Sequence, residues 1–344
     1  MGKHRKPSLL AAAALLSPIL GVVLVLLLVP LTVRDGDALP VPAAAPAPVR
    51  TREPIRPLAA PAPADPRLAA LGRRLFEDPI LSRDGTVSCR TCHDLSHGGA
   101  DPHPVAVGIG GAAGGVNTPT VYNAAMNLAQ FWDGRARTLE EQIDGPLTSP
   151  AEMGSDWPGV LARLTASPYR AEFRAVSGRD PDADTVRAAI AAFERTLVTT
   201  GSRFDAWLRG DEDALTPDEK AGYALFKSYG CSSCHQGANV GGNLFQRFGF
   251  FGDLFADRGG GTAADLGRYN VTGRDADRHV FKVPSLRLAA LTAPYFHDGS
   301  VPTLFEAVRL MGRYQLGREI EEGDIALIVQ FLGALPGRML EDRP

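Results

Sequence analysis

The sequence predicts a mainly α-helical protein built from two similar halves. Three observations carry this prediction: several segments have apolar residues at helical spacing, strand signals are few, and the motif Cys-x-x-Cys-His occurs twice, starting at Cys89 and at Cys231. The chain has 344 residues, which is enough for two domains of ordinary size. Its formal net charge of −3 gives no sign of a basic, nucleic-acid-binding face, so we expect no nucleic-acid partner.

The first 33 residues predict either a membrane anchor or an export signal. Three basic residues precede an uncharged apolar run over residues 9–33, an order typical of exported proteins. The run exceeds the usual signal-peptide core of about 7–15 residues and could span a bilayer, which takes about 20. We therefore favour an anchored protein in the periplasm, on the outer face of the cytoplasmic membrane. Small residues after the run keep a cleaved signal as the alternative. Residues 34–66 are rich in Pro and Ala, and we expect a semi-rigid spacer there.

The folded body is expected from residue 67 onward. Thr138 with Glu141, and Thr216 with Glu219, have the spacing of capping boxes at helix starts, and Gly201 is a plausible helix stop. The clearest helical segments are residues 66–78, 138–147, 182–202, 216–230 and 321–337. Each motif follows one helix and precedes a long glycine-rich loop. We expect an N-terminal domain over residues 67–205 and a C-terminal domain over residues 206–337.

The repeated motif is the attachment signal of c-type haem. The two thiols of such a motif bond to the porphyrin, and the histidine binds the iron. All four cysteines of the chain belong to the two copies, which are Cys89, Cys92 and His93, and Cys231, Cys234 and His235. A zinc site made from two Cys-x-x-Cys pairs usually has them about 15–20 residues apart. We therefore expect two covalently bound haems, one in each domain, and neither a zinc site nor a disulfide.

The ligand on the second face of each iron decides what the haem does. A second protein ligand favours electron transfer, whereas an open or polar face favours catalysis, and a methionine ligand raises the potential. The chain beyond the apolar run has four methionines, Met126, Met153, Met311 and Met339. Composition alone does not choose among them, because most methionines fill cores.

Blocks of the chain resemble the bacterial di-haem cytochrome c peroxidase family over residues 66–337. The matching blocks include "SCRTCHDL", "NTPTVYNAAMNLAQFWDGRARTLEEQIDGPL", "GCSSCHQGANVGG", "FKVPSLRLAALTAPYFHDGSVPTLFEAV" and "MGRYQLG". The resemblance implies two cytochrome c-like haem domains packed against each other, usually in a homodimer. It also implies a peroxidase that reduces hydrogen peroxide to water with electrons from a small periplasmic c-type cytochrome or cupredoxin.

The resemblance assigns roles to four further residues. Met311 matches the second ligand of the C-terminal haem, which makes this haem an electron store. Trp132 matches a tryptophan between the haems, although a buried core tryptophan fits the sequence equally well. Glu152 and Gln142 match a carboxylate and an amide beside the N-terminal iron. One carboxylate can take the first proton of peroxide and return it to the leaving oxygen.

A calcium site between the domains is also implied. Its matching residues are Asn117, Thr292 and Pro294. Calcium takes oxygen ligands, including backbone carbonyls, so the side chains alone test this expectation weakly.

One position departs from the family pattern. Many members close the N-terminal iron with a histidine in the loop after the first motif, and the ungapped alignment places Ile109 there. Isoleucine cannot bind iron. We expect the oxidised iron to stay open, and His97 or His103 taking over the position is the alternative. Without a role in iron binding, His97 and His103 are ordinary solvated loop residues.

Two other functions compete with the peroxidase. A related di-haem enzyme oxidises protein tryptophans during maturation of a quinone cofactor, and it has tyrosine at the position of Met311. The nearest tyrosine here is Tyr314, three residues away, which favours the peroxidase. A plain electron carrier would have a second protein ligand at both irons. Glu152, Gln142 and Ile109 argue against this.

Overall fold

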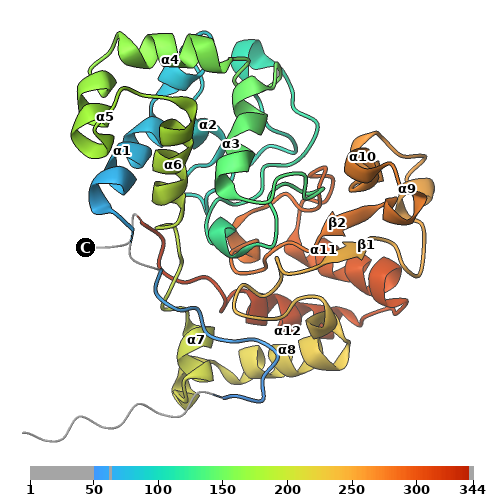
Figure 1. Cartoon of the computed structure of the whole chain (residues 1–344). Helices are drawn as coiled ribbons and strands as arrows, with labels where there is room; N and C mark the ends of the chain where they lie inside the picture. Colours follow the sequence, from blue (N-terminus) through green and yellow to red (C-terminus); the bar gives the residue numbers. More distant parts are fainter. Residues whose placement is uncertain (1–49, 62–63, 341–344) are drawn as a thin grey trace, which may run out of the picture. The chain divides into compact units, whose positions relative to one another are not determined.

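The computed structural model describes residues 50–61 and 64–340. The predicted anchor at residues 9–33 lies outside the described residues, and so does the first part of the spacer. Within the described ranges no helix has the length and apolar character needed to cross a membrane. The described part is mainly helical, as predicted, and its single sheet has two short strands (Figure 1).

The elements follow one another in this order. The α-helices are α1 (Pro66–Glu77), α2 (Cys89–Cys92), α3 (Leu139–Thr148), α4 (Trp157–Thr165), α5 (Tyr169–Ser177), α6 (Ala183–Glu194), α7 (Arg203–Leu208), α8 (Pro217–Ser228), α9 (Leu254–Asp257), α10 (Tyr269–Thr272), α11 (Leu304–Leu310) and α12 (Glu322–Leu332). The strands β1 (Phe245–Arg247) and β2 (Val280–Lys282) pair antiparallel, with Gln246 opposite Phe281. A π-helical turn, η9 (Met311–Gln315), continues α11. The 3₁₀ turns are η1 (Pro79–Leu81), η2 (Ile109–Gly111), η3 (Ala124–Met126), η4 (Glu212–Ala214), η5 (Cys231–Ser233), η6 (Ala264–Leu266), η7 (Asp275–Asp277) and η8 (Ala289–Leu291).

Helix caps explain several of the starts. The capping box of Thr216 and Glu219 forms as predicted at the start of α8. At α3 only half of the predicted box forms. Thr138 accepts the N–H of Glu141, whereas the Glu141 carboxylate accepts the N–H of Arg137. The cap still fixes where α3 begins, and α3 carries Gln142.

Two pairs of helices cross closely at a glycine, one pair in each half of the chain. A side chain at Gly72 of α1 would collide with the carbonyl oxygen of Ala189 on α6, and a side chain at Gly222 of α8 would collide with that of Leu327 on α12. Figure 1 shows α1 beside α6 and α8 beside α12. Only glycine permits such a close approach of two helix backbones. The two halves therefore share one packing device, which supports the repeat inferred from the motifs.

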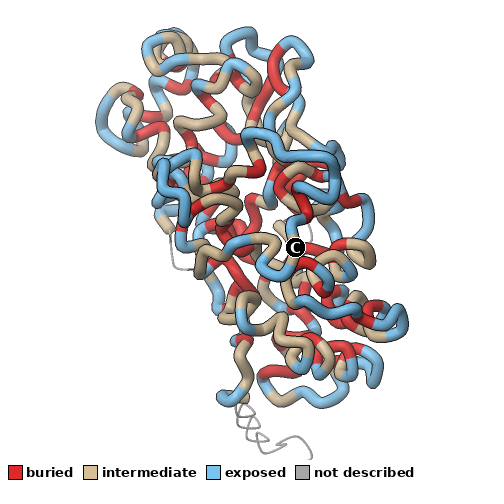
Figure 2. The backbone as a smooth tube through the Cα atoms, turned by 90° about the vertical axis from the view of Figure 1, so that its right-hand side faces the viewer, coloured by how far each residue is buried: buried red, intermediate tan, exposed pale blue. Residues whose placement is uncertain are grey.

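The hydrophobic core divides into two main clusters. The first is built mainly from α1, α3, α4, α5 and α6, and the second mainly from α7, α8 and α12. Figure 2 shows buried backbone positions mostly in the interior of the described part and exposed positions mostly on its outer turns. Helix α7 packs in the second cluster, so the expected boundary after residue 205 falls inside an element that belongs with the C-terminal half.

The last part of the expected spacer packs on the C-terminal half. Ile55 and Leu58 are fully buried, and Ile55 belongs to the second cluster. Glu53 pairs with Lys227 at 2.9 Å and accepts a hydrogen bond from the Tyr223 hydroxyl at 2.7 Å. This segment differs from a free spacer because its two large apolar side chains gain by leaving water.

Candidate active site and its two cavities

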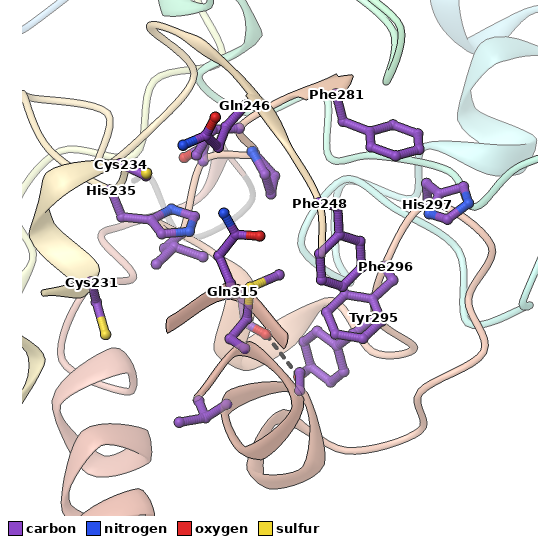
Figure 3. A pocket seen from close by; sticks show the side chains of 18 of the residues that line it. Cys231, Cys234, His235, Gln246, Phe248, Phe281, Tyr295, Phe296, His297 and Gln315 are labelled. Atoms are coloured by element: carbon purple, nitrogen blue, oxygen red, sulfur yellow. Dashed lines mark hydrogen bonds between the residues drawn. The ribbon is translucent and has the colours of Figure 1, made fainter. Parts of the chain in front are cut away.

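A large cavity surrounds the second Cys-x-x-Cys-His motif. Its volume is about 470 Å³, within the range of ordinary ligand pockets. Cys231, Cys234 and His235 line it together with Met311. Figure 3 shows His235 on one side and the rings of Phe248, Tyr295 and Phe296 grouped on the other. The walls are mostly apolar, which suits a flat aromatic macrocycle.

The charged groups of this cavity also fit a haem. Among the described residues that line it there is no Asp or Glu, whereas Lys282 is 7% exposed and has no carboxylate partner. Burial lowers the pKa of Lys282 to about 8. An anionic group beside it would remove this cost, and the propionates of a haem are such groups. Burial also lowers the pKa of His235 to about 4, which keeps its imidazole neutral and able to bind a metal.

Met311, and not Tyr314, lines the large cavity. Tyr314 is buried, and its hydroxyl donates a hydrogen bond to Asp257 at 2.8 Å. The π-helical turn that begins at Met311 separates the directions of these two side chains, and such turns often occur at functional sites. Met311 therefore lies in the wall of the cavity that contains the second motif, and its role as a haem ligand stays a prediction.

A smaller cavity, of about 140 Å³, surrounds the first motif. Cys89, Cys92 and His93 line it, and Gly114 and Gly115 of the following loop form part of its wall. The His93 Nδ1 atom lies 3.1 Å from the carbonyl oxygen of Gly99. That contact leaves Nε2 for a metal and fixes the orientation of the ring. The two thiols and the histidine repeat the donor set of the large cavity, so they fit a second haem.

Glu152 and Gln142 meet in the small cavity, as the resemblance implied. Gln142 lies on α3, and Glu152 lies in the turn after it. Both line the cavity beside His93, together with Phe131 and Arg135. Burial raises the pKa of the Glu152 carboxyl, while Ser149 and Arg135 act in the opposite direction. A carboxyl with a raised pKa can both take and give a proton near neutral pH.

None of the three loop residues considered for the open face lines the small cavity. His97 and His103 are exposed and lie beside Asp94 and Asp101, with ring nitrogens at 2.7 and 3.3 Å from a carboxylate oxygen. Ile109 is 5% exposed and belongs to the first core cluster. Its N–H donates to the carbonyl of Glu152 at 2.8 Å, and its side chain occupies the space that a side chain on Gly154 would need. These contacts hold the loop beside Glu152, and Ile109 presents no ligand atom to the cavity that His93 lines.

Trp132 lines the large cavity and is bonded to the wall that both cavities share. Residues 117–120 line both cavities. The Trp132 indole N–H donates to the carbonyl of Asn117 at 2.9 Å, and its own carbonyl accepts from the N–H of Lys282 at 2.9 Å. Its ring also packs edge-on against His297 at 6.4 Å. Trp132 is therefore half-buried in the wall of the large cavity, and its place between the two haems stays a prediction.

The three residues expected at a calcium site all line the large cavity. They are Asn117, Thr292 and Pro294. The Asn117 side-chain amide donates to the carbonyls of His103 and Pro104. Both bonds use the amide nitrogen of Asn117 and not its oxygen. The calcium assignment stays a prediction.

Sequence reasoning missed two buried charged groups at the cavities, Lys282 and Glu194. Glu194 carried a usable signal, because it follows a long apolar face of the helix that the sequence predicts over residues 182–202. Lys282 carried none, because its burial depends on the pairing of two distant short strands.

Comparisons with known proteins show the family of the chain. Residues 66–213 match the family model of the di-haem cytochrome c peroxidases. The chain is 47% identical over 85% of its length to the cytochrome c peroxidase Ccp of Escherichia coli, of which it covers 63%. It is 48% identical over 83% of its length to the cytochrome c551 peroxidase of Nitrosomonas europaea, of which it covers 84%. The methylamine utilization protein MauG of Methylorubrum extorquens is 42% identical over 72% of the chain and is covered to 68%.

The fold has solved counterparts. The crystal structure of a MauG-like protein associated with microbial copper homeostasis superposes with a TM-score of 0.71 at 29% identity, covering 83% of this chain and 93% of that one. The motifs, the cavities and the relatives lead to one conclusion: the chain belongs to the di-haem cytochrome c peroxidase family.

Proposed function

We propose that this protein reduces hydrogen peroxide to water with electrons from a small c-type cytochrome or cupredoxin. The observation that carries the proposal is the meeting of Glu152, with its raised pKa, and His93 in one cavity. Two relatives that are 47% and 48% identical to the chain are named cytochrome c peroxidases, which supports the same activity.

Bound haem would supply a redox-active iron in each cavity, attached through Cys89 and Cys92 and through Cys231 and Cys234. Glu152 takes a proton from the incoming peroxide and returns it to the leaving oxygen, and one carboxyl suffices for both steps. Gln142, next to it in the cavity wall, offers an amide that orients the peroxide by hydrogen bonding.

Electrons for the reaction enter through the C-terminal half. Met311 would complete the ligand set of that haem and raise its potential, so that it stores one electron. Trp132 gives an aromatic path between the two sites, because it is bonded to the wall that they share.

The rival functions are less well supported by the geometry. Maturation of a quinone cofactor would call for a tyrosine ligand, and the hydroxyl of Tyr314 is engaged by Asp257 outside the cavity. A plain electron carrier would have a second ligand at each iron, and the loop that carries Ile109 offers none to His93.

The wider proposal follows the same resemblance. It comprises two cytochrome c-like haem domains, a calcium ion bound by Asn117, Thr292 and Pro294, a homodimer, and a periplasmic location with residues 9–33 as an anchor. The helix pairs crossing at Gly72 and Gly222 support the two-domain part of it.

Steady-state turnover of hydrogen peroxide with a reduced small cytochrome tests the proposal. We expect the purified holoprotein to oxidise the cytochrome only when peroxide is present. Absence of turnover, together with two six-coordinate haems, would overturn the peroxidase assignment and leave an electron carrier.

A further inference from the structure

Glu194, the last residue of α6, is a buried carboxyl that the proposed reaction does not use. It is 6% exposed, and its Oε2 atom is buried without a hydrogen-bond partner. The residue lines the small cavity together with Cys89 and Ile190. A buried carboxyl without a partner costs free energy, so its presence beside a cofactor cavity calls for a functional reason.

Among the described residues on the elements packed around Glu194, each cation is paired or exposed. Its neighbour in sequence, Arg195, pairs with Glu140 of α3 at 2.7 Å. The other charged groups on the elements packed around α6 are paired with one another or capped. These are Arg73 with Glu77, Arg74 with Glu172, Arg90 with Glu77, Arg187 with Asp144 and Asp184, and Glu141 with the N–H of Arg137. The remaining charged side chain of α1, Arg67, is exposed beside Asp65.

The protonation of Glu194 follows from these surroundings. Burial raises the pKa of its carboxyl to about 8, Arg195 opposes the rise, and Glu140 adds to it. The carboxyl therefore holds its proton at neutral pH when no positive charge lies beside it. A positive charge gained by the neighbouring cavity would lower this pKa, because charges interact strongly where water is excluded.

We propose that Glu194 takes up one proton when the N-terminal haem is reduced by one electron and releases it when that haem is oxidised. The electron comes from the donor through the C-terminal half, and the proton comes from solvent water, so the charge of the cavity stays the same. Glu194 acts on the iron through this charge balance and does not touch the peroxide. The proposal rests on the haem at His93 and not on peroxide turnover.

The pH dependence of the haem midpoint potentials tests the proposal in the absence of peroxide. One proton taken up per electron shifts a one-electron couple by about 59 mV for each tenfold change in proton concentration. We expect the N-terminal potential of the wild-type protein to fall with pH at up to this slope over the interval between the two pKa values of Glu194. In Glu194→Gln, which is neutral at every pH, the slope should be smaller by the part that Glu194 supplies, and any remaining slope belongs to Glu152, the other carboxyl of the cavity.

The chain offers its own controls. The large cavity has no Asp or Glu among its described lining residues, so the C-terminal potential should be unaffected by Glu194→Gln in the same titration. Asp180→Asn changes a surface carboxylate that pairs with Arg170 and Arg174 outside the cavity, and it should keep the wild-type slope. Glu194→Asp, which restores a carboxyl, should recover the slope at least in part.

The outcomes separate the explanations. An unchanged N-terminal slope in Glu194→Gln would overturn the proposal. Equal loss of slope in Asp180→Asn would also overturn it, because the effect would then not belong to the buried carboxyl. Haem content and circular dichroism check that the variants fold. If peroxide turnover fails while the slope depends on Glu194, the proposed function falls and this inference stands.

Discussion

The two cavities hold the same Cys-x-x-Cys-His donor set and differ in almost everything else. The C-terminal cavity is about three times as large (470 against 140 Å³), has Met311 in its wall, and contains a buried lysine but no carboxyl among its described lining residues. The N-terminal cavity has two carboxyls, Glu152 and Glu194, both with a raised pKa. The motif therefore determines where haem is attached, and the groups around it decide whether that haem stores an electron or handles protons.

Removing the Glu152 carboxyl should change the N-terminal cavity most strongly. Glu152→Gln keeps the size of the side chain but abolishes proton transfer, so peroxide turnover should fall by about 10²–10⁴-fold. Steady-state oxidation of a reduced small cytochrome measures the effect. Glu140→Gln, a carboxylate paired on the surface with Arg195, is the matched control and should keep nearly full activity. Turnover within a few-fold of wild type in Glu152→Gln would contradict the assignment.

Replacing the proposed ligand tests the other cavity. In Met311→Leu the C-terminal haem loses its thioether, so its potential should fall and its low-spin signal should disappear. Potentiometric titration followed by absorbance would show this change at one haem alone. Met153→Leu is the control, since Met153 lines the small cavity and is packed in the first core cluster. A normal C-terminal spectrum in Met311→Leu would show that another residue binds that iron.

The path between the cavities makes a third test. Trp132→Phe keeps an aromatic ring but loses the bond to Asn117, so electron transfer between the haems should slow while both spectra stay unchanged. Rapid-mixing kinetics of haem reoxidation by peroxide would detect the slowing. Trp157→Phe, which removes an indole bonded to Asp144 far from the shared wall, should leave the rate unchanged. Equal rates in all three proteins would assign Trp132 a packing role only.

The smallest expected effect concerns stability. The pKa of Glu194 is about 8 in the folded protein and 4.5 in its ordinary state, so between these values the folded chain holds more protons than the unfolded one. The free energy of unfolding should therefore decrease as pH rises from about 4.5 to about 8, and Glu194→Gln should remove this part of the decrease. Thermal unfolding of the fully reduced holoprotein at pH 5 and pH 8 measures it. A variant that loses as much stability with pH as the wild type would contradict the buried, neutral state of Glu194.

The sequence predicted what depends on local patterns. The starts of α1, α3, α6, α8 and α12 and the cap of Thr216 could be found because each signal lies within a few neighbouring residues. The end of α6 could not: the helix expected over residues 182–202 stops at Glu194 and not at Gly201. The resemblance predicted that Glu152 and Gln142 lie near His93, and all three line one cavity of the structure.

What the sequence did not predict depends on contacts between distant segments. The packing of Ile55 against the C-terminal half and the burial of Lys282 are settled by partners far along the chain. Ile109 shows the same limit. Its inability to bind iron could be read directly, but its place in the core and its backbone bond to Glu152 could not.

The central claim is that the N-terminal iron is open in the oxidised protein while the C-terminal iron is closed. The electron paramagnetic resonance spectrum of the fully oxidised holoprotein tests it most directly. We predict a high-spin signal from the N-terminal haem together with a low-spin signal from the C-terminal haem. A purely low-spin spectrum at both haems would contradict the account.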